Sequence, residues 1–229
     1  MGWYAKPSGG YSTTDNEAQQ NMFMVSQILQ DYGWSMVAIA GLLGNVGAES
    51  GFNPWRWQKD RVNYDKGYGL VQFTPADYYI GGRGTEVGIV GYAPNLSVSE
   101  QTTGASETDG EAQLQVIEVY HDDKFLDRRN KCNYADLTDT YPYSSYKNLT
   151  DLWIATVGWL YNYEYPGAEY RDYAHAYARY LTAQECYQII TGSPPPTPPH
   201  PPTPPSTDSG KFPLYFYMAR KNKAKKGLL

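Results

Sequence analysis

Residues 44–54, GNVGAESGFNP, place a carboxylate at the end of the most apolar helix that the sequence predicts. Residues 34–46, which lead into this stretch, contain almost no polar side chain, as is typical of a helix in the middle of a domain. We predict a helix over residues 36–50, capped at its start by Ser35 and ended at Gly51. Its apolar stripe runs into the carboxylate, because the last members of the stripe follow helical spacing: Leu42, Val46 and Glu49.

The position of Glu49 favours a carboxyl that keeps its proton. Burial among apolar groups disfavours the charged form, and the partial negative charge of a helix C-terminus disfavours it further, so we expect a raised pKa. Such a carboxyl can protonate a glycosidic oxygen. In the alternative, Glu49 turns to solvent at a frayed helix end or pairs with Arg56 or Arg61. Three small residues are expected to leave space beside Glu49 for a bulky ligand: Gly44, Gly47 and Ala48.

The composition is that of a globular protein with an unusual number of tyrosines. Of the 229 residues, 41% are hydrophobic and 19% are charged, whereas aromatic residues reach 15% and include 23 tyrosines. Tyrosine combines a large apolar ring with a hydroxyl and therefore suits partly wet surfaces that hold a polar ligand. Carbohydrate-binding clefts and protein interfaces are both built in this way.

The negative charge is concentrated in the main body of the chain. From residue 210 onward there are six basic residues and no acidic ones. Without these six and Asp208, 13 basic and 23 acidic residues remain, which gives residues 1–192 a net charge of −10. An acidic body of this kind argues against nucleic acid as the main partner.

Cysteine and histidine usage indicates neither a metal site nor a cofactor. Cys132 and Cys186 show no metal-binding spacing, and the three histidines are scattered. The two cysteines form either a disulfide or two separate thiols. The N-terminus lacks the pattern of a secretory signal, and no apolar run approaches the roughly 20 residues of a transmembrane helix.

The remaining patterns predict a mainly helical domain. Thr14 and Glu17 form a capping box for a first helix. Residues 63–74 are rich in turn residues and then in β-formers, which favours a short hairpin. Residues 81–110 predict a long loop, because they are rich in Gly, Ser and Thr and show little periodicity. Beside the helix at residues 36–50, we predict four helices: residues 14–32, 111–121, 148–163 and 168–185.

Composition divides the chain into three parts. Residues 1–192 form the domain, residues 193–209 form a Pro-rich linker, and residues 210–229 form an aromatic and then basic tail. The linker has a stiff polyproline part of about 37 Å at ~3.1 Å per residue. We expect the tail either to dock the domain on a partner protein or an anionic surface, or to serve only as a solubilising extension.

Two motifs resemble the paired motif of lysozyme-like lytic transglycosylases. In that family E-S-x-F-N-P closes the catalytic helix and G-L-x-Q-x-x-P forms the facing hairpin, as ESGFNP at residues 49–54 and GLVQFTP at residues 69–75 do here. The chain is more similar still to the virion-associated tail lysozymes of bacteriophages over residues 12–190. It departs from them at Phe73, where a Trp is usual, and in the length of residues 81–110. The matching elements are GW at residues 33–34, GN…ES at 44–50, NP…WQ at 53–58, GYGLVQFTPA at 67–76 and YEYP at 163–166.

The resemblance implies a lysozyme-like fold, mainly α (α+β), in which helices face a short β-hairpin. It implies a peptidoglycan hydrolase of the phage virion that cleaves the β-1,4 bond between N-acetylmuramic acid and N-acetylglucosamine. Glu49 would be the general acid. Phage tail or virion proteins would be its partners through the tail segment, and the host cell wall its site of action. Candidates for contacts with the sugar are Trp57, which could equally be core, and Tyr68, Gln72, Thr74, Tyr163 and Glu164.

A second carboxylate is needed only for hydrolysis. An inverting hydrolase places a base carboxylate about 6.5–9.5 Å from the acid, and Asp60 and Asp65 are the candidates. Either could instead be a solvated loop charge. A lytic transglycosylase would use Glu49 alone, as acid and then as base, while the 6-hydroxyl of the substrate attacks. The alternative from another class is a non-catalytic tail protein that binds glycan on a degenerate lysozyme fold.

Overall fold

The computed structural model describes residues 2–6, 8–76, 79, 109–119 and 121–197. Most of the predicted loop at residues 81–110, most of the linker and the whole tail at residues 210–229 lie outside the described residues. The division into domain, linker and tail therefore stays a prediction.

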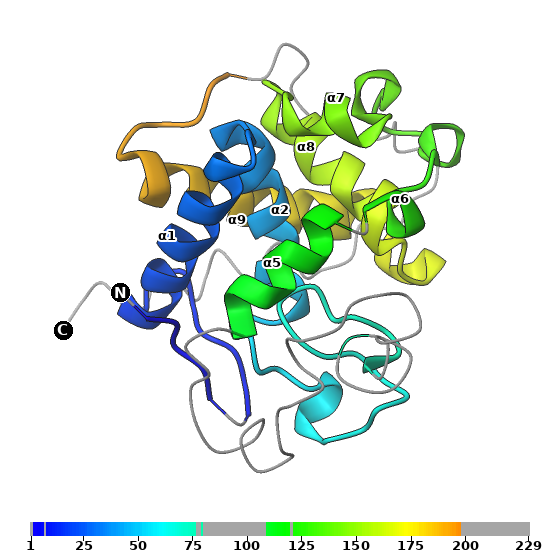
Figure 1. The fold of residues 1–229 in the computed structure, drawn as a ribbon. Coiled ribbons are helices and arrows are strands. Elements are labelled where there is room, and N and C mark those ends of the chain that lie inside the picture. The colour runs from blue at the N-terminus through cyan, green and yellow to red at the C-terminus, as the bar shows by residue number, and fades with distance from the viewer. Residues whose placement is uncertain (1, 7, 77–78, 80–108, 120, 198–229) are drawn as a thin grey trace, which may run out of the picture.

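The described chain is mainly helical, as the sequence predicted (Figure 1). Its α-helices are α1 (Asn16–Asp31), α2 (Met36–Glu49), α5 (Asp109–Val119), α6 (His121–Lys124), α7 (Tyr143–Lys147), α8 (Leu152–Trp159) and α9 (Tyr173–Thr191). Short 3₁₀ helices are η1 (Gln58–Asp60), η3 (Arg129–Lys131), η4 (Thr138–Thr140) and η6 (Ala168–Tyr170), and a π-helical turn, η5 (Leu160–Glu164), continues α8.

Helix α2 is the central element of the domain. It packs against α8 and α9 most closely and also against α1 (Figure 1). Ten consecutive residues of α2, from Val37 to Val46, are buried. Gly41 and Gly44 permit this close packing, since a Cβ on Gly41 would lie 2.7 Å from Ala155 Cβ of α8. A Cβ on Gly44 would lie 2.5 Å from the backbone oxygen of Arg179 in α9. Gly44 therefore packs against α9 and does not provide the space for a ligand that the sequence predicted.

The predicted ends of α2 agree with the structure, whereas the predicted start of α1 does not. The Ser35 hydroxyl accepts a hydrogen bond from Ala38 N at 3.1 Å and caps α2. Helix α1 begins after Asp15, and its capping box was wrong, because the Asp15 carboxylate binds the preceding turn by accepting from Ser12 N at 2.8 Å. The Thr14 hydroxyl lies 3.1 Å from that of Ser12 and does not cap the helix.

The predicted β-hairpin is not confirmed, because the described residues form no strand. Tyr68 and Phe73 exchange backbone hydrogen bonds of 3.1 and 2.8 Å around a tight turn, and Tyr68 also bridges to Trp57. The turn is completed by a side chain, since Gln113 of α5 accepts a hydrogen bond from Leu70 N at 2.7 Å. The segment therefore forms a tight turn with isolated bridges rather than two strands.

The two C-terminal helices are also shifted from their predicted bounds. Helix α8 starts only after Asp151, whose carboxylate accepts from Ile154 N at 3.0 Å. Helix α9 is capped by Asp172, which accepts from His175 N at 2.8 Å, and it continues past the predicted end to Gly192, which has a φ of 68°. A polar cap inside each predicted helix sets its true start.

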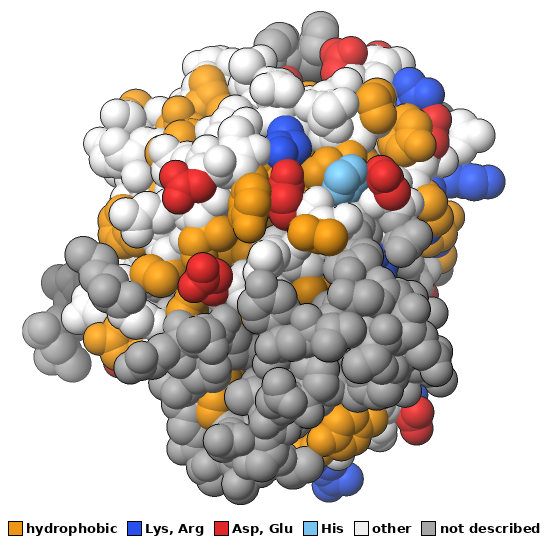
Figure 2. Space-filling model, in the orientation of Figure 1, with side chains coloured by type: hydrophobic (Ala, Val, Ile, Leu, Met, Phe, Trp, Pro, Cys, Tyr) orange, Lys and Arg blue, Asp and Glu red, His pale blue; other side chains and the backbone are white. Residues whose placement is uncertain are grey.

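On the face shown in Figure 2, acidic, basic and apolar side chains are interspersed over the described surface. Cys132 and Cys186 are free thiols, so the disulfide alternative is not realised. Among the described helices, none combines the length and the hydropathy that crossing a membrane requires.

Candidate functional site

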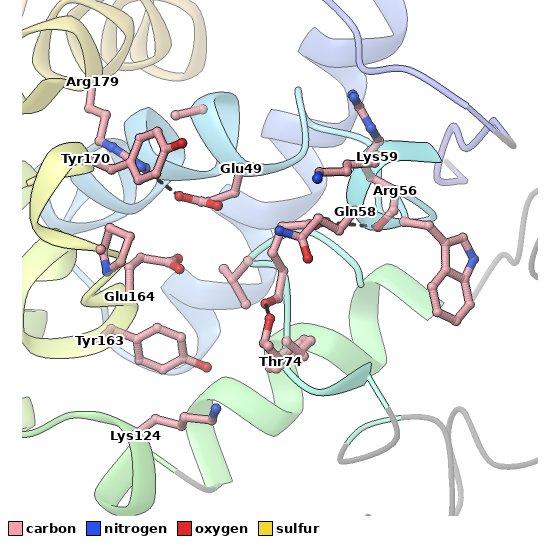
Figure 3. A pocket seen from close by; sticks show the side chains of 17 residues that line it. Glu49, Arg56, Gln58, Lys59, Thr74, Lys124, Tyr163, Glu164, Tyr170 and Arg179 are labelled. Atoms are coloured by element: carbon pink, nitrogen blue, oxygen red, sulfur yellow. Dashed lines mark hydrogen bonds and ion pairs between the residues drawn. The ribbon is translucent and has the colours of Figure 1, made fainter. Parts of the chain in front are cut away.

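A pocket of about 600 Å³ lies where the end of α2 faces the 71–74 turn and the end of the π-helical turn η5 (Figure 3). Its volume is within the range of about 300–1,000 Å³ that is common for small-molecule sites. Charged side chains line it from five segments: Glu49 from α2, Arg56 and Lys59 from residues 56–59, Lys124 from α6, Glu164 from η5 and Arg179 from α9.

The residues that follow Glu49 in the motif build the exit from α2. The Ser50 hydroxyl donates back to Val46 O at 3.1 Å, and Gly51 takes a φ of 58° where the chain passes within contact of Gly10. The Asn53 amide donates to Lys6 O and Gly9 O, both at 2.8 Å. The motif thus ties the N-terminal segment to the end of α2.

Glu49 is paired with an arginine that the sequence analysis missed. Arg179 Nη2 donates to Glu49 Oε1 at 2.7 Å, and the side chains of Arg179 and Glu49 are 8% and 21% exposed. The same guanidinium donates through Nη1 to Asn45 Oδ1 at 3.2 Å. The Asn45 amide in turn donates to Thr156 O of α8 at 3.1 Å. Helices α8 and α9 therefore both hold the carboxyl that ends α2.

This ion pair revises the expected surroundings of Glu49. Arg56, one of the two arginines considered from the sequence, pairs instead with Asp60 at 2.7 Å. Of the three small neighbours, Ala48 lines the pocket, whereas a Cβ on Gly47 would lie 2.8 Å from the ring of Phe52. The carboxyl thus has positive charge beside it, in addition to the burial and the helix end that the sequence predicted.

Glu164 lines the pocket on the wall opposite the 71–74 turn (Figure 3). Its Oε1 accepts a hydrogen bond of 3.0 Å from the indole of Trp159. Burial and, to a lesser extent, the neighbouring charge of Glu49 raise the pKa of Glu164 to about 8, against the opposing effects of Arg179, the Trp159 hydrogen bond and Lys124. At neutral pH this carboxyl therefore keeps its proton.

The facing turn carries two of the predicted sugar contacts into the pocket. Gln72 and Thr74 both line it. The Gln72 amide donates to Arg56 O at 2.9 Å and to Gly69 O at 3.0 Å, so its nitrogen is used to hold the turn. The exposed Thr74 hydroxyl donates to Gln72 O at 2.8 Å and keeps its lone pairs for a ligand.

The predicted aromatic contacts fall into two groups. Trp57 and Tyr163 line the pocket although each is largely buried, and Tyr163 stacks on Trp159 at 4.1 Å. The indole nitrogen of Trp57 is buried and has no hydrogen-bond partner among the described residues. Tyr68 is fully buried, lies outside the pocket lining and packs against Trp57 at 4.7 Å. The structure therefore gives Tyr68 a packing position.

The two aspartates suggested as a second carboxylate do not line this pocket. Asp60 is exposed, pairs with Arg56 and accepts a hydrogen bond from Gly9 N at 2.8 Å. Asp65 is an exposed residue of the loop before the turn. Neither side chain shares a wall with Glu49, and their catalytic role stays a prediction.

Backbone strain is concentrated around the pocket. Positive φ in a residue other than glycine costs energy, and such residues cluster at functional sites. Among the described residues, those with positive φ lie in the segments that build the pocket walls: Phe52, Lys59, Asp60, Gln72 and Tyr165.

Sequence reasoning also missed other lining residues besides Arg179, among them Lys59, Lys124 and Tyr170. Of these residues, only Arg179 stands in a sequence pattern that could have indicated its role. It lies on the buried face of α9 with Ala176 and Ala183, and an arginine in an apolar stripe indicates a buried partner. Within the described ranges, no group of three or more His, Cys, Asp or Glu side chains could hold a metal ion.

Comparison with known proteins gives the family. The sequence profile described as "Phage tail lysozyme" matches residues 19–190. Over 75 residues the chain is 40% identical to "Morphogenesis protein 1" of Bacillus phage B103, an alignment that covers 31% of this chain and 20% of that relative. The chain thus spans about a fifth of the length of this curated relative. Since the profile covers most of the chain, the protein belongs to the phage tail lysozyme family.

Proposed function

We propose that the protein is a muramidase that cleaves the β-1,4 bond between N-acetylmuramic acid and N-acetylglucosamine in peptidoglycan. Glu49 is the general acid that protonates the leaving oxygen. The observation that carries the proposal is the fixed carboxyl of Glu49 at the wall of a 600 Å³ pocket, held by Arg179 at 2.7 Å. A preorganised carboxyl beside a binding cleft is what general acid catalysis requires.

The glycan lies between the 71–74 turn and the wall formed by η5. Thr74 and Gln72 offer oxygen atoms to N-acetyl and hydroxyl groups, and Tyr163 with Trp57 supplies apolar surface for sugar rings. Phe73, which also lines the pocket, stacks on Tyr79 at 5.0 Å and is itself nearly buried. Sugar stacking at this position is therefore weak.

We further propose that the protein acts from the phage tail, where it opens the cell wall locally while the genome enters the host. Residues 210–229 tether it to a virion protein. A chain truncated after residue 192 should keep its activity on purified cell wall and lose its incorporation into particles. Unchanged incorporation would remove the tethering role.

The test of the activity compares the wild type with Glu49→Gln on purified peptidoglycan, with the soluble fragments analysed by mass spectrometry. Glu111→Gln is the matched control, because Glu111 is an exposed glutamate of α5 outside the pocket lining. We expect muropeptide release by the wild type and the control, and none by Glu49→Gln. Fragments with reducing ends would show hydrolysis, and fragments lighter by one water would show lytic transglycosylation.

If the wild type binds several wall types and releases nothing from any of them, the muramidase proposal fails. The non-catalytic alternative, a tail protein that binds glycan on a lysozyme fold, then takes its place.

A further inference from the structure

Two carboxyl groups meet in the pocket, and the sequence analysis gave a catalytic role to only one of them. Glu49 closes α2, and Glu164 closes η5, which continues α8. Figure 3 shows both side chains directed into the same cavity from neighbouring positions on its wall. They come from segments more than a hundred residues apart, and each is fixed by a different partner: Arg179 for Glu49 and Trp159 for Glu164.

The fixation leaves one oxygen of each carboxyl unused. Arg179 binds Oε1 of Glu49, and the Trp159 indole binds Oε1 of Glu164. The second oxygen of each group has no protein partner among the described residues and is available to a substrate or a water. An acid and a base that act on one bond need this arrangement.

Charged groups from three other elements act on Glu164. Glu49 of α2 is the like charge, and Arg179 of α9 and Lys124 of α6 are the opposite charges. Two carboxyls that interact strongly resist ionising together, so the proton that Glu164 keeps at neutral pH can be exchanged within the pair. Arg179 supplies the positive charge beside Glu49.

We propose that Glu164 is the second catalytic carboxyl, which takes the proton of the attacking hydroxyl while Glu49 protonates the leaving oxygen. Glu164 holds the proton at neutral pH, so the reaction proceeds from the form in which that proton has moved to Glu49 and Glu164 is ionised. The bond from the anomeric carbon to the leaving oxygen breaks and that oxygen receives the proton of Glu49. The attacking oxygen bonds to the anomeric carbon and its proton passes to Glu164. The pair thus ends with one proton, as it began.

This inference rests on the proposed muramidase activity and applies both to hydrolysis and to lytic transglycosylation. The attacking hydroxyl is that of a water in hydrolysis and the 6-hydroxyl of the substrate in transglycosylation. The inference differs from the sequence-based prediction, which looked for the base at Asp60 or Asp65. Neither aspartate lines the pocket, whereas Glu164 does.

The experiment is a pH–rate profile on soluble glycan fragments of peptidoglycan for the wild type, Glu164→Gln and Lys124→Met. The wild type should lose activity as pH rises through about 8, because Glu164 then loses the proton that the reaction passes to Glu49. Glu164→Gln keeps an oxygen for the Trp159 indole and so should fold, as circular dichroism checks. Its kcat should fall by ~10²–10⁴-fold, the usual contribution of a general base, with a smaller change in KM.

Lys124→Met supplies a second readout that does not remove the carboxyl. Because the charge of Lys124 lowers the pKa of Glu164, its removal should move the loss of activity to higher pH. A merely structural role of Glu164 would leave this midpoint where it is.

The possible results separate the two proposals. The inference is overturned if Glu164→Gln is as active as the wild type and has the same pH–rate profile. It is also overturned if Asp60→Asn or Asp65→Asn no longer loses activity near pH 8 as the wild type does. In both cases the muramidase proposal survives if Glu49→Gln is inactive. A wild type that cleaves no glycan overturns both.

Discussion

Replacing Glu164 by Gln should change how the stability of the protein depends on pH. The pKa of Glu164 is about 8 in the folded protein against 4.5 for an unperturbed glutamate, so the folded state binds more protons than the unfolded state between these values. The stability contribution of this carboxyl is therefore fully present below pH 4.5 and is lost as pH rises through about 8. Glu164→Gln has no such contribution to lose.

The magnitude follows from the same two values. One pKa unit corresponds to about 1.4 kcal/mol, so a rise from 4.5 to about 8 sets an upper limit of about 5 kcal/mol. The side chain is only partly buried, and solvent screening reduces the effect to roughly 2–4 kcal/mol. For a domain of this size 1 kcal/mol shifts Tm by about 2–4 °C, which gives roughly 4–16 °C.

The assay is thermal unfolding followed by circular dichroism from about pH 5 to about pH 9 at constant ionic strength. The Tm of Glu164→Gln minus that of the wild type should rise across this range by the amount above. Glu111→Gln is the control and should run parallel to the wild type. A Tm difference between Glu164→Gln and the wild type that stays constant over the whole pH range would contradict the raised pKa of Glu164.

Three further predictions concern the packing around α2. Arg179→Met should cost about 3 kcal/mol or more, because it leaves a partly buried carboxylate unpaired. In a urea-denaturation cycle with Glu49→Gln the two changes should be non-additive by about 0.5–3 kcal/mol, and simple additivity would contradict the ion pair. Gly44→Ala should cost about 1–3 kcal/mol, since its Cβ meets the α9 backbone at 2.5 Å, whereas Gly2→Ala has open space and should be neutral. Equal midpoints for these two variants would count against the packing argument. Asn53→Ala should cost about 1–3 kcal/mol and speed proteolysis of the N-terminal segment, because two backbone carbonyls lose their donor. An unchanged rate of proteolysis would mean that other contacts hold the N-terminal segment in place.

The parts of the fold that could be predicted are those with local signals. Helix α2 was placed correctly because its cap at Ser35 and its stop at Gly51 are both short-range features. The start of α1 was misplaced because Thr14 and Asp15 are adjacent and either could have been the cap. The hairpin was overestimated because Gln113, which satisfies the turn at 2.7 Å, comes from a helix far along the chain.

The site shows the same division between local and distant information. Glu49, Gln72 and Thr74 could be located because they sit in short motifs, and all three line the pocket. The pairing of Glu49 with Arg179 joins residues 130 positions apart, and no local pattern contains it. The raised pKa of Glu164 likewise depends on packing and on Glu49, so the sequence could only suggest a wall residue at that position.

The role of Glu49 is tested most directly by a crystal structure of Glu49→Gln with a bound oligosaccharide of alternating N-acetylmuramic acid and N-acetylglucosamine. We predict that the glycan lies between the 71–74 turn and Glu164, with a glycosidic oxygen about 2.6–3.2 Å from the side chain at position 49. An ordered glycan on another surface, with this pocket empty, would contradict it.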